Sequence, residues 1–334
     1  MQRPTLQTSR LSDVLAPAAD DLAAVEALFH ETCESAHPLV REMVHHSQRF
    51  SGKRLRPALV VLAGRASGEW DEEIVPVAVV VEMIHTATLV HDDVLDEALL
   101  RRQVSSCNAL FGNEGAVLLG DFLFARAFAL SASLRNRLAS RYLAEITSVV
   151  CQGEILQNRE RGNLDLTEER YFEIIGKKTA VLYAASGEVG ARYAGAPEES
   201  VRALHAFGQG IGLAFQIVDD VLDVDGDEEE AGKSLGTDFA KGKMTLPVLH
   251  ALRAAAPADR DALRALLADP GAAADRGARG RARAILRRAG SVAFALGRAE
   301  GLVGEAREHL DRLPPSPSRD ALSGLADYVL QRRR

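Results

Sequence analysis

Two stretches of the chain, residues 72–90 and 204–222, are apolar around nearly their whole circumference when drawn as helices. Helices of that kind belong in the middle of a large bundle, where neighbouring helices cover every face. Elsewhere apolar residues recur at helical spacing, and alternating runs of β-branched residues are scarce. The pattern therefore predicts an all-α protein. Gly208, Gly210 and Gly212 follow no strand, so they predict close packing between helices and not a dinucleotide loop.

The apolar periodicity predicts helices over most of the chain, with loops rich in turn residues between them. The expected helices are 18–30, 37–50, 57–66, 72–97, 113–138, 140–161, 167–190, 197–224, 242–255, 258–268, 279–311 and 317–332. No stretch resembles a linker between independent domains, and no fixed-period repeat is visible. A chain of 334 residues buries enough surface to fold without disulfides or a structural metal. We expect residues 1–334 to form one large domain.

Composition argues against several other classes of protein. Three widely spaced cysteines without a CxxC pair predict neither a disulfide framework nor a zinc site, and they fit a reducing cytoplasm. No N-terminal apolar segment resembles a signal peptide, and Glu82 interrupts the longest candidate for a membrane span. The net charge of −7 argues against nucleic-acid binding. We therefore expect a cytoplasmic protein with no integral membrane segment.

The pentapeptide DDVLD occurs twice, at 92–96 and 219–223, each time at the end of an apolar helix. Its first and last aspartates are four residues apart, so they share one helix face. Carboxylates at the end of a buried helix need a cation. Mg²⁺ is suitable because it takes one or two protein carboxylates and completes its shell with water and phosphate oxygens. A lone motif is as often a solvated helix end, but two identical copies favour several Mg²⁺ ions around one diphosphate.

A site for a metal and a diphosphate also needs positive side chains, because arginine and lysine bind phosphate oxygens. The sequence supplies them in residues 52–57, in the pairs 101–102 and 177–178, and at Lys233 and Lys243. Each group alone is expected to be solvated surface charge, whereas together with six aspartates they form a set suited to two diphosphates. The segment 226–234 imitates a P-loop, but it has one residue too many between its glycines and acidic residues where phosphate would lie.

Five motifs, GKRLRP, HDDVLDEALLRR, GKKTAVL, FQIVDDVLD and GKSLGTDFAKGKMTLP, occur in that order. Together they resemble the trans-isoprenyl diphosphate synthases, or polyprenyl synthetase family, over nearly the whole chain. The resemblance implies a bundle of mostly antiparallel helices around a deep cavity, usually in a homodimer. It also implies a Mg²⁺-dependent prenyltransferase that joins isopentenyl diphosphate to an allylic diphosphate and makes a trans-polyprenyl diphosphate.

The resemblance assigns roles to residues at the matching positions. It implies that Asp92, Asp96 and Asp219 bind Mg²⁺, supported by Asp93, Asp220 and Asp223. Residues implied to contact the allylic diphosphate are Arg101, Lys178, Thr179, Gln216, Lys233 and Lys243. Residues implied to bind isopentenyl diphosphate are Gly52, Lys53, Arg56, His85 and Arg102. In the mechanism that the resemblance implies, the metal ions, with Lys178 and Lys233, stabilise charge on the departing diphosphate as the allylic carbon–oxygen bond ionises. Isopentenyl diphosphate is then expected to attack the allylic cation, and proton loss to leave a chain longer by one isoprene unit.

Product length is expected to depend on side chains beneath the metal site. Ala87 and Thr88 lie one helical turn before Asp92, where short-chain members of the family carry a bulky aromatic residue. The next layers are expected at Val80, Met83 and Ile84, with Phe124 or Phe128 of the helix 113–138 as a floor. One helical turn rises about 5.4 Å, close to one isoprene unit, so the layers predict roughly six to ten units, about C30–C50. An apolar product of this size implies transient contact with a membrane at release.

Other functions remain open at this point. A shorter product would make the chain a geranylgeranyl or farnesyl diphosphate synthase. A class I terpene cyclase also ionises an allylic diphosphate, but it resembles this chain in only one aspartate motif. A non-catalytic subunit of a heteromeric synthase generally lacks intact aspartate or basic motifs, and both are intact here. A metal-buffering or structural helical protein would not need the cationic residues. The paired motifs therefore favour condensation.

Overall fold

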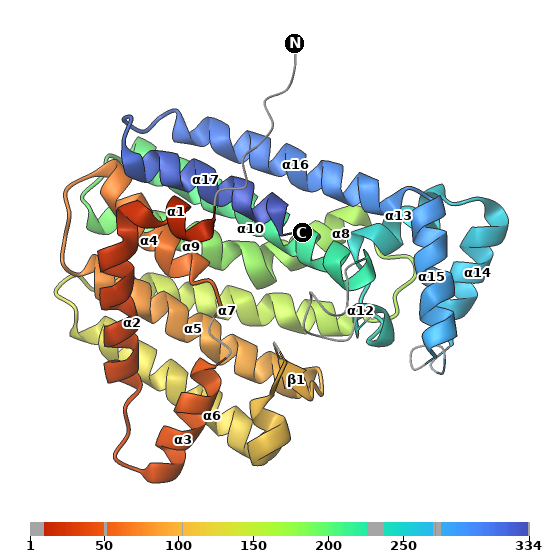
Figure 1. Cartoon of the computed structure of the whole chain (residues 1–334), viewed down its shortest axis with the longest axis horizontal. Coiled ribbons are helices and arrows are strands. Elements are labelled where there is room, and N and C mark those ends of the chain that lie inside the picture. The colour runs from red at the N-terminus through yellow and green to blue at the C-terminus, as the bar shows by residue number, and fades with distance from the viewer. Residues whose placement is uncertain are drawn as a thin grey trace.

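The computed structural model describes residues 10–49, 52–101, 103–225, 237–269, 271 and 275–332. Long helices lie side by side across the molecule, and shorter helices cross them at the two ends (Figure 1). The predicted all-α fold is confirmed. Apart from helices, the described residues form one two-stranded antiparallel hairpin, in which Leu100 pairs with Ser105.

The elements follow one another along the chain as follows. They are α1 Leu11–Val14, η1 Ala16–Ala18, α2 Ala19–Cys33, α3 Pro38–Gln48, α4 Leu55–Ser67, α5 Ile74–Leu95, β1 Leu100–Arg101, β2 Val104–Ser105, α6 Cys107–Ser133, α7 Leu138–Arg159, α8 Glu168–Ile175, η2 Gly176–Ala180, α9 Val181–Tyr193, α10 Glu198–Asp225, α12 Thr237–Ala240, α13 Leu246–Ala254, α14 Pro257–Ala268, α15 Arg276–Arg288, α16 Ser291–Leu310 and α17 Pro317–Gln331.

The core is built around α4, α5, α9 and α10. Residues 58–64 of α4 and 77–84 of α5 are all buried, as expected for helices that are apolar on every side. Glycine lets the backbones meet closely. A Cβ atom on Gly208 would lie 2.3 Å from the carbonyl oxygen of Tyr183, and one on Gly212 would lie 2.7 Å from Cα of Ala180. The close helix packing predicted for this glycine cluster is confirmed.

Several predicted boundaries differ from the structure because glycines break the helices. The helix expected at 113–138 begins at Cys107, with a kink at Gly112, where φ is 75° and ψ is 165°. The single helix expected at 279–311 is two helices, α15 and α16, separated by Gly290 at φ 69°. Left-handed backbone of this kind is readily adopted by glycine and ends a helix. The helix expected at 167–190 is continuous but widens into a π-helical turn, η2.

Two helices within the described residues are long and apolar enough to cross a membrane, by length and composition only. They are α5, with mean hydropathy 1.7, and α6, with mean hydropathy 1.5. The exclusion of a membrane span because of Glu82 was therefore too strict, since one acidic residue leaves the mean hydropathy of an 18-residue window high. In α5, 67% of that window is buried inside the protein, as in a core helix, whereas in α6 only 33% is buried.

Candidate active site

A cavity of about 1400 Å³ opens between the ends of α5 and α10, with α7 and η2 forming one wall. It exceeds the usual range of roughly 300–1,000 Å³ for a site that binds one small molecule. The predicted residues that line it are Lys53, Arg56, His85, Thr88, Asp92, Asp93, Asp96, Arg101, Phe124, Lys178, Thr179, Gln216, Asp219, Asp220 and Lys243. The two DDVLD motifs, far apart in sequence, therefore meet at one cavity.

Some predicted residues do not line this cavity. Gly52, Met83, Ala87, Phe128 and Asp223 belong to the described structure but lie outside the lining. Ala87 and Met83 are fully buried in the core. Phe128 packs behind Phe124, with ring centroids 6.3 Å apart. Arg102 and Lys233 lie outside the described residues.

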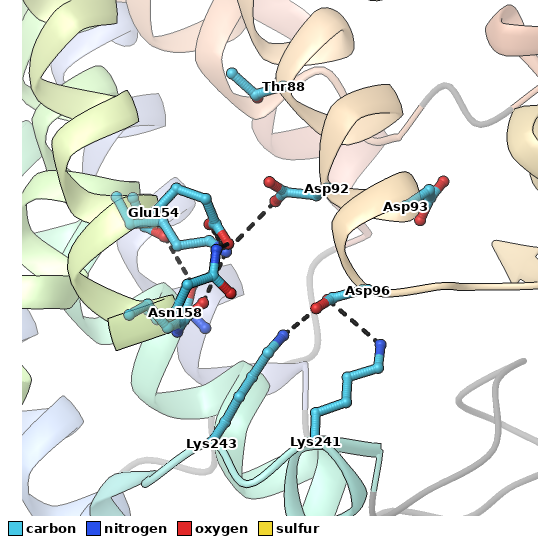
Figure 2. A network of polar contacts seen from close by, with 12 residues as sticks. Thr88, Asp92, Asp93, Asp96, Glu154, Asn158, Lys241 and Lys243 are labelled. Carbon is cyan, nitrogen blue, oxygen red and sulfur yellow. Dashed lines mark hydrogen bonds and ion pairs between the residues drawn. The ribbon is translucent and has the colours of Figure 1, made fainter. Parts of the chain in front are cut away.

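In the first motif, Asp92 and Asp96 share one face of α5, and Asp93 points away from them (Figure 2). Asp92 faces α7 and η2, where the ammonium group of Lys178 is 3.5 Å from its carboxylate. Lys178 also forms an ion pair with Glu154 and donates a hydrogen bond to Oε1 of Gln157 at 2.9 Å. Asp92 is thus the less tightly held of the two cavity-facing carboxylates in this motif.

Asp96 is in contact with three cations. Lys243 lies 2.8 Å and Lys241 3.4 Å from its Oδ2 atom, and Arg161 donates to its Oδ1 atom at 2.9 Å. Figure 2 shows both lysines reaching toward this carboxylate from the turn after α12. Burial alone would raise the pKa of Asp96, but the lysines around it lower the pKa to about 2. Asp96 is therefore fully charged at neutral pH.

Asp93 is buried on the other side of α5 and accepts two hydrogen bonds from Arg101, each of 2.7 Å. Burial raises the pKa of the Asp93 carboxyl, and the guanidinium of Arg101 opposes that rise. The hairpin β1–β2 carries Arg101, so this bidentate pair fastens the hairpin to the end of α5. Arg101 still lines the cavity, with a quarter of its side chain exposed.

The second motif divides its aspartates in a similar way. Asp219 is the most exposed of the three, and its carboxylate lies 3.3 Å from Arg332 at the end of α17. Asp220 is buried and accepts hydrogen bonds from the Tyr171 hydroxyl at 2.7 Å and the Gln216 amide at 2.8 Å. Burial raises the pKa of Asp220, and the nearby Asp238 carboxylate adds to the rise. Asp223 is fully buried.

Asp223 accepts the backbone N–H of Asp238 at 2.9 Å. That bond ties the end of α10 to the start of α12, which lies just before the lysine-bearing turn. Asp223 therefore supports the cavity from behind and does not face it.

The basic side chains of the motif at 52–57 do not all face the cavity. Arg56 donates to Nε2 of His85 at 2.9 Å, and its guanidinium lies 4.2 Å from the ring centroid of Tyr183. Lys53 lies over the ring of Tyr328, 4.8 Å from its centroid. Arg54 turns to the interior, where it donates to Glu82 at 2.6 Å. Arg54 thus stabilises the fold while its neighbours line the cavity.

Lys178 and Thr179 lie in η2, the π-helical turn that follows α8. Such turns insert an extra residue into a helix and are frequent at functional sites. Gly153 of α7 lets η2 approach closely, since a Cβ there would lie 2.4 Å from the backbone nitrogen of Lys178. The hydroxyl of Thr179 donates to Gln216 on α10 at 2.7 Å. One short turn therefore connects both sides of the cavity.

The sequence prediction missed the wall that α7 contributes. Its cavity-lining polar residues are Glu154, Gln157 and Asn158, and Lys241 and Tyr171 line the cavity from other segments. The spacing of Val150, Glu154, Gln157 and Asn158 on one helix face is a signal that could have found the wall. Lys241 lies inside the motif GKSLGTDFAKGKMTLP, but the motif does not show that this side chain reaches Asp96.

Comparisons with known proteins agree with this geometry. The polyprenyl synthetase family model matches residues 37–279. The octaprenyl diphosphate synthase of Escherichia coli strain K12 is 37% identical over 95% of this chain and 97% of that protein. The nonaprenyl diphosphate synthase of Mycobacterium tuberculosis is 38% identical over 93% of this chain and 92% of that protein.

Two solved structures resemble the whole fold. A decaprenyl diphosphate synthase from Rhodobacter capsulatus has a TM-score of 0.90 at 40% identity, over 97% of this chain and 100% of that one. A polyprenyl synthase from Caulobacter crescentus, complexed with calcium and isoprenyl diphosphate, has a TM-score of 0.92 at 35% identity, over 99% and 100% of the two chains. The resemblance inferred from the ordered motifs is confirmed. The chain belongs to the polyprenyl synthetase family of prenyltransferases.

Proposed function

We propose that this chain condenses isopentenyl diphosphate with an allylic diphosphate to make a long-chain trans-polyprenyl diphosphate in the presence of Mg²⁺. The observation that carries the proposal is the convergence of two DDVLD motifs and a set of basic residues on one large cavity. Relatives named octaprenyl, nonaprenyl and decaprenyl diphosphate synthase support the long product.

The acidic residues fit Mg²⁺. Within the described residues, no three His, Cys, Asp or Glu side chains form a group that could hold a metal ion by themselves. Mg²⁺ does not require one, since it usually takes one or two carboxylates and fills its shell with water and phosphate oxygens. Asp92, Asp96 and Asp219 are the cavity-facing carboxylates proposed as its ligands. Asp93, Asp220 and Asp223 are proposed to support them through the buried hydrogen bonds described above.

The basic residues divide into two proposed substrate subsites. The first group, proposed to hold the allylic diphosphate, is Arg101, Lys178 and Lys243 together with the polar residues Thr179 and Gln216. The second group, proposed to hold isopentenyl diphosphate, is Lys53, Arg56 and His85. Arginine can grip a phosphate with two parallel hydrogen bonds, while lysine acts as a point charge. Gly52, Arg102 and Lys233 remain proposals from the resemblance alone.

The reaction is driven by charge stabilisation at the leaving group. Bound Mg²⁺ supplies positive charge at the departing diphosphate. Lys178 and Lys243 donate to its oxygens as negative charge grows there, which favours ionisation of the allylic carbon–oxygen bond. Lys53 and Arg56 hold isopentenyl diphosphate so that its terminal alkene carbon attacks the cation. No described residue stands out as the base, and the released diphosphate is proposed to accept the proton.

The growing chain is proposed to lie against the apolar part of the cavity. Thr88, Leu89, Phe124 and Val150 line that part, and small Thr88 leaves room beneath Asp92. Phe124 is held from behind by Phe128, which favours a role for the pair as a floor. Ala87 and Met83, buried beside this path, are proposed to influence length only through packing.

A homodimer is proposed because α6 and α7 carry large apolar side chains that are exposed. The exposed fractions of Leu110, Leu118 and Ile155 are 53%, 67% and 66%. Contiguous exposed apolar surface is typical of protein interfaces.

The core forms one cluster from Ala18 to Val329, which supports a single domain. We propose that the dimer works in the cytoplasm and contacts a membrane only transiently, when it releases product.

Product analysis tests the proposed function. The purified chain is incubated with isopentenyl diphosphate, farnesyl diphosphate and Mg²⁺, and the dephosphorylated products are separated by chromatography. We expect polyprenols of roughly six to ten units on the layer counting above, and none after chelation of Mg²⁺. Asp92→Ala and Asp219→Ala are each expected to lower turnover by several orders of magnitude while circular dichroism stays unchanged.

Three outcomes would contradict the proposal. Near-normal turnover in either aspartate variant would remove the proposed metal ligands. A hydrocarbon formed from farnesyl diphosphate without isopentenyl diphosphate would favour a terpene cyclase. Inactivity of the purified chain alone would favour a subunit of a heteromeric enzyme.

A further inference from the structure

Lys241 lies within the motif GKSLGTDFAKGKMTLP, yet the proposed subsites give it no role. It lines the cavity, and its ammonium group lies 3.4 Å from Oδ2 of Asp96. Lys243 binds the same oxygen at 2.8 Å, and Arg161 binds the other oxygen at 2.9 Å. One carboxylate therefore carries three positive partners, which is more than its charge can neutralise.

The three cations are not equivalent. Arg161 lies outside the cavity lining, so it holds Asp96 from the protein side. Lys243 has a second acidic partner, Asp238, at 3.5 Å. Lys241 has no other ion pair among the described residues, and its contact with Asp96 is the longest of the three. It is therefore the cation most easily displaced from Asp96.

The backbone fixes the direction from which Lys241 approaches. Gly242 lies between the two lysines at φ 65°, and its carbonyl oxygen accepts the N–H of Gly162 at 2.8 Å. Gly162 follows Arg161 directly and is also left-handed, at φ 71°. A Cβ on Gly242 would lie 3.3 Å from the nitrogen of Gly162. This contact between two glycines joins the end of α7 to the turn after α12, so all three cations are held around one carboxylate.

We propose that Lys241 is a further diphosphate-binding residue, which pairs with Asp96 until a metal ion takes the Oδ2 atom of that carboxylate. The inference rests on the proposed role of Asp96 as a Mg²⁺ ligand. Mg²⁺ held by Asp96 would supply positive charge that competes with the ammonium group of Lys241 for this carboxylate. Lys241 would then pair with diphosphate oxygens in the cavity, to which lysine makes charge-assisted hydrogen bonds. Without diphosphate, Lys241 competes with Mg²⁺ for the same oxygen.

The proposal predicts that one variant gains affinity for Mg²⁺ and loses affinity for pyrophosphate. Lys241→Gln removes the competing cation, so Mg²⁺ alone should bind the variant several-fold more tightly than it binds the wild type. The same substitution removes a ligand for phosphate, so inorganic pyrophosphate at saturating Mg²⁺ should bind about tenfold more weakly. The factor by which Mg²⁺ strengthens pyrophosphate binding should therefore be smaller in the variant. Pyrophosphate should strengthen Mg²⁺ binding by that same smaller factor.

Calorimetric titration of the full-length chain measures both affinities without any turnover. Lys241→Arg keeps the charge and should restore pyrophosphate binding to near the wild-type value. Lys177→Gln is the matched control, because Lys177 pairs with Glu173 and does not line the cavity. It should leave both affinities unchanged. The thermal unfolding midpoint of each variant is measured alongside.

The proposal is overturned if Lys241→Gln binds pyrophosphate as the wild type does, or if Lys177→Gln weakens it equally. It is also overturned if Lys241→Gln loses both affinities, which is the result expected when a residue only supports the fold. Failure of the proposed function is distinguishable, because it appears as absent polyprenyl product from a wild type that still binds Mg²⁺ and pyrophosphate cooperatively.

Discussion

Replacing Gly153 by alanine tests the contact that positions Lys178. The added Cβ would lie 2.4 Å from the backbone nitrogen of Lys178, 2.7 Å from its Cα and 2.8 Å from the carbonyl carbon of Lys177. Carbon atoms in ordinary contact are about 3.5–4.0 Å apart. The obstructing atoms are all backbone, so no flexible side chain can move aside. We therefore expect α7 and η2 to separate by about 1 Å, the shortfall from that contact distance.

The separation has two measurable consequences. Overpacking of this kind costs about 1–3 kcal/mol, and the better helix propensity of alanine offsets about 1 kcal/mol of it. Urea unfolding should therefore show a free energy of unfolding lower by up to about 2 kcal/mol. A shift of about 1 Å in a group that positions substrate can lower the rate about 100-fold. Because Lys178 contacts Asp92 and Glu154, kcat should fall about ten- to hundredfold.

A matched control is Gly304→Ala on α16, where the added Cβ meets nothing within 4 Å. This variant should be stabilised by about 0.5–1 kcal/mol and keep its kcat, since only helix propensity changes. Wild-type stability and kcat in Gly153→Ala would refute the close approach of α7 and η2. Lower stability with unchanged kcat would show that the contact supports the fold without positioning Lys178.

Three further outcomes are expected. Thr88→Tyr should shorten the product to about three or four isoprene units, since Thr88 lines the cavity about 6 Å from Asp92, and chromatography showing unchanged length would contradict this. Ala87→Tyr should lower the free energy of unfolding in urea by about 1–3 kcal/mol, because Ala87 is fully buried in the core. Burial alone would raise the pKa of Glu188, yet hydrogen bonds from His205 and two other donors lower it from 4.5 to about 2. Glu188→Gln should therefore lose about 3 kcal/mol of unfolding free energy at neutral pH, and the difference from wild type should vanish as pH falls from about 4.5 to 2.

The sequence predicted the fold well where a pattern is local. Helical periodicity located the core helices, because a helix that is apolar on every side must be covered by others. Boundaries were less certain where a single backbone angle decides them, as at Gly112 and Gly290. Glycine occurs within helices as well as at their ends, so its letter alone does not reveal which angle it adopts. The π-helical turn at Gly176–Ala180 leaves no periodic signature in five residues.

The sequence predicted those parts of the site in which helix geometry alone places residues on the same face. The spacing within 92–96 placed Asp92 and Asp96 together, and the structure agrees. The second copy of DDVLD has the same letters, yet its last aspartate is buried against the start of α12, whereas Asp96 faces the cavity. Asp223 and Asp96 differ in their surroundings because different segments, from elsewhere in the sequence, pack against them.

The same reasoning explains why the α7 wall and Lys241 were missed. The charge of Lys241 is meaningful only because Gly242 and Gly162 bring its turn beside the end of α7, and no spacing rule connects those two segments. A motif therefore indicates which residues can bind a ligand or take part in catalysis. Long-range packing decides how many cations contact one carboxylate. Around Asp96 that packing assembles more cations than a carboxylate needs, and the excess has a use only when an anion with several charges enters the cavity. The excess of cations around Asp96 is thus a further argument for a diphosphate substrate, in addition to the repeated aspartate motif.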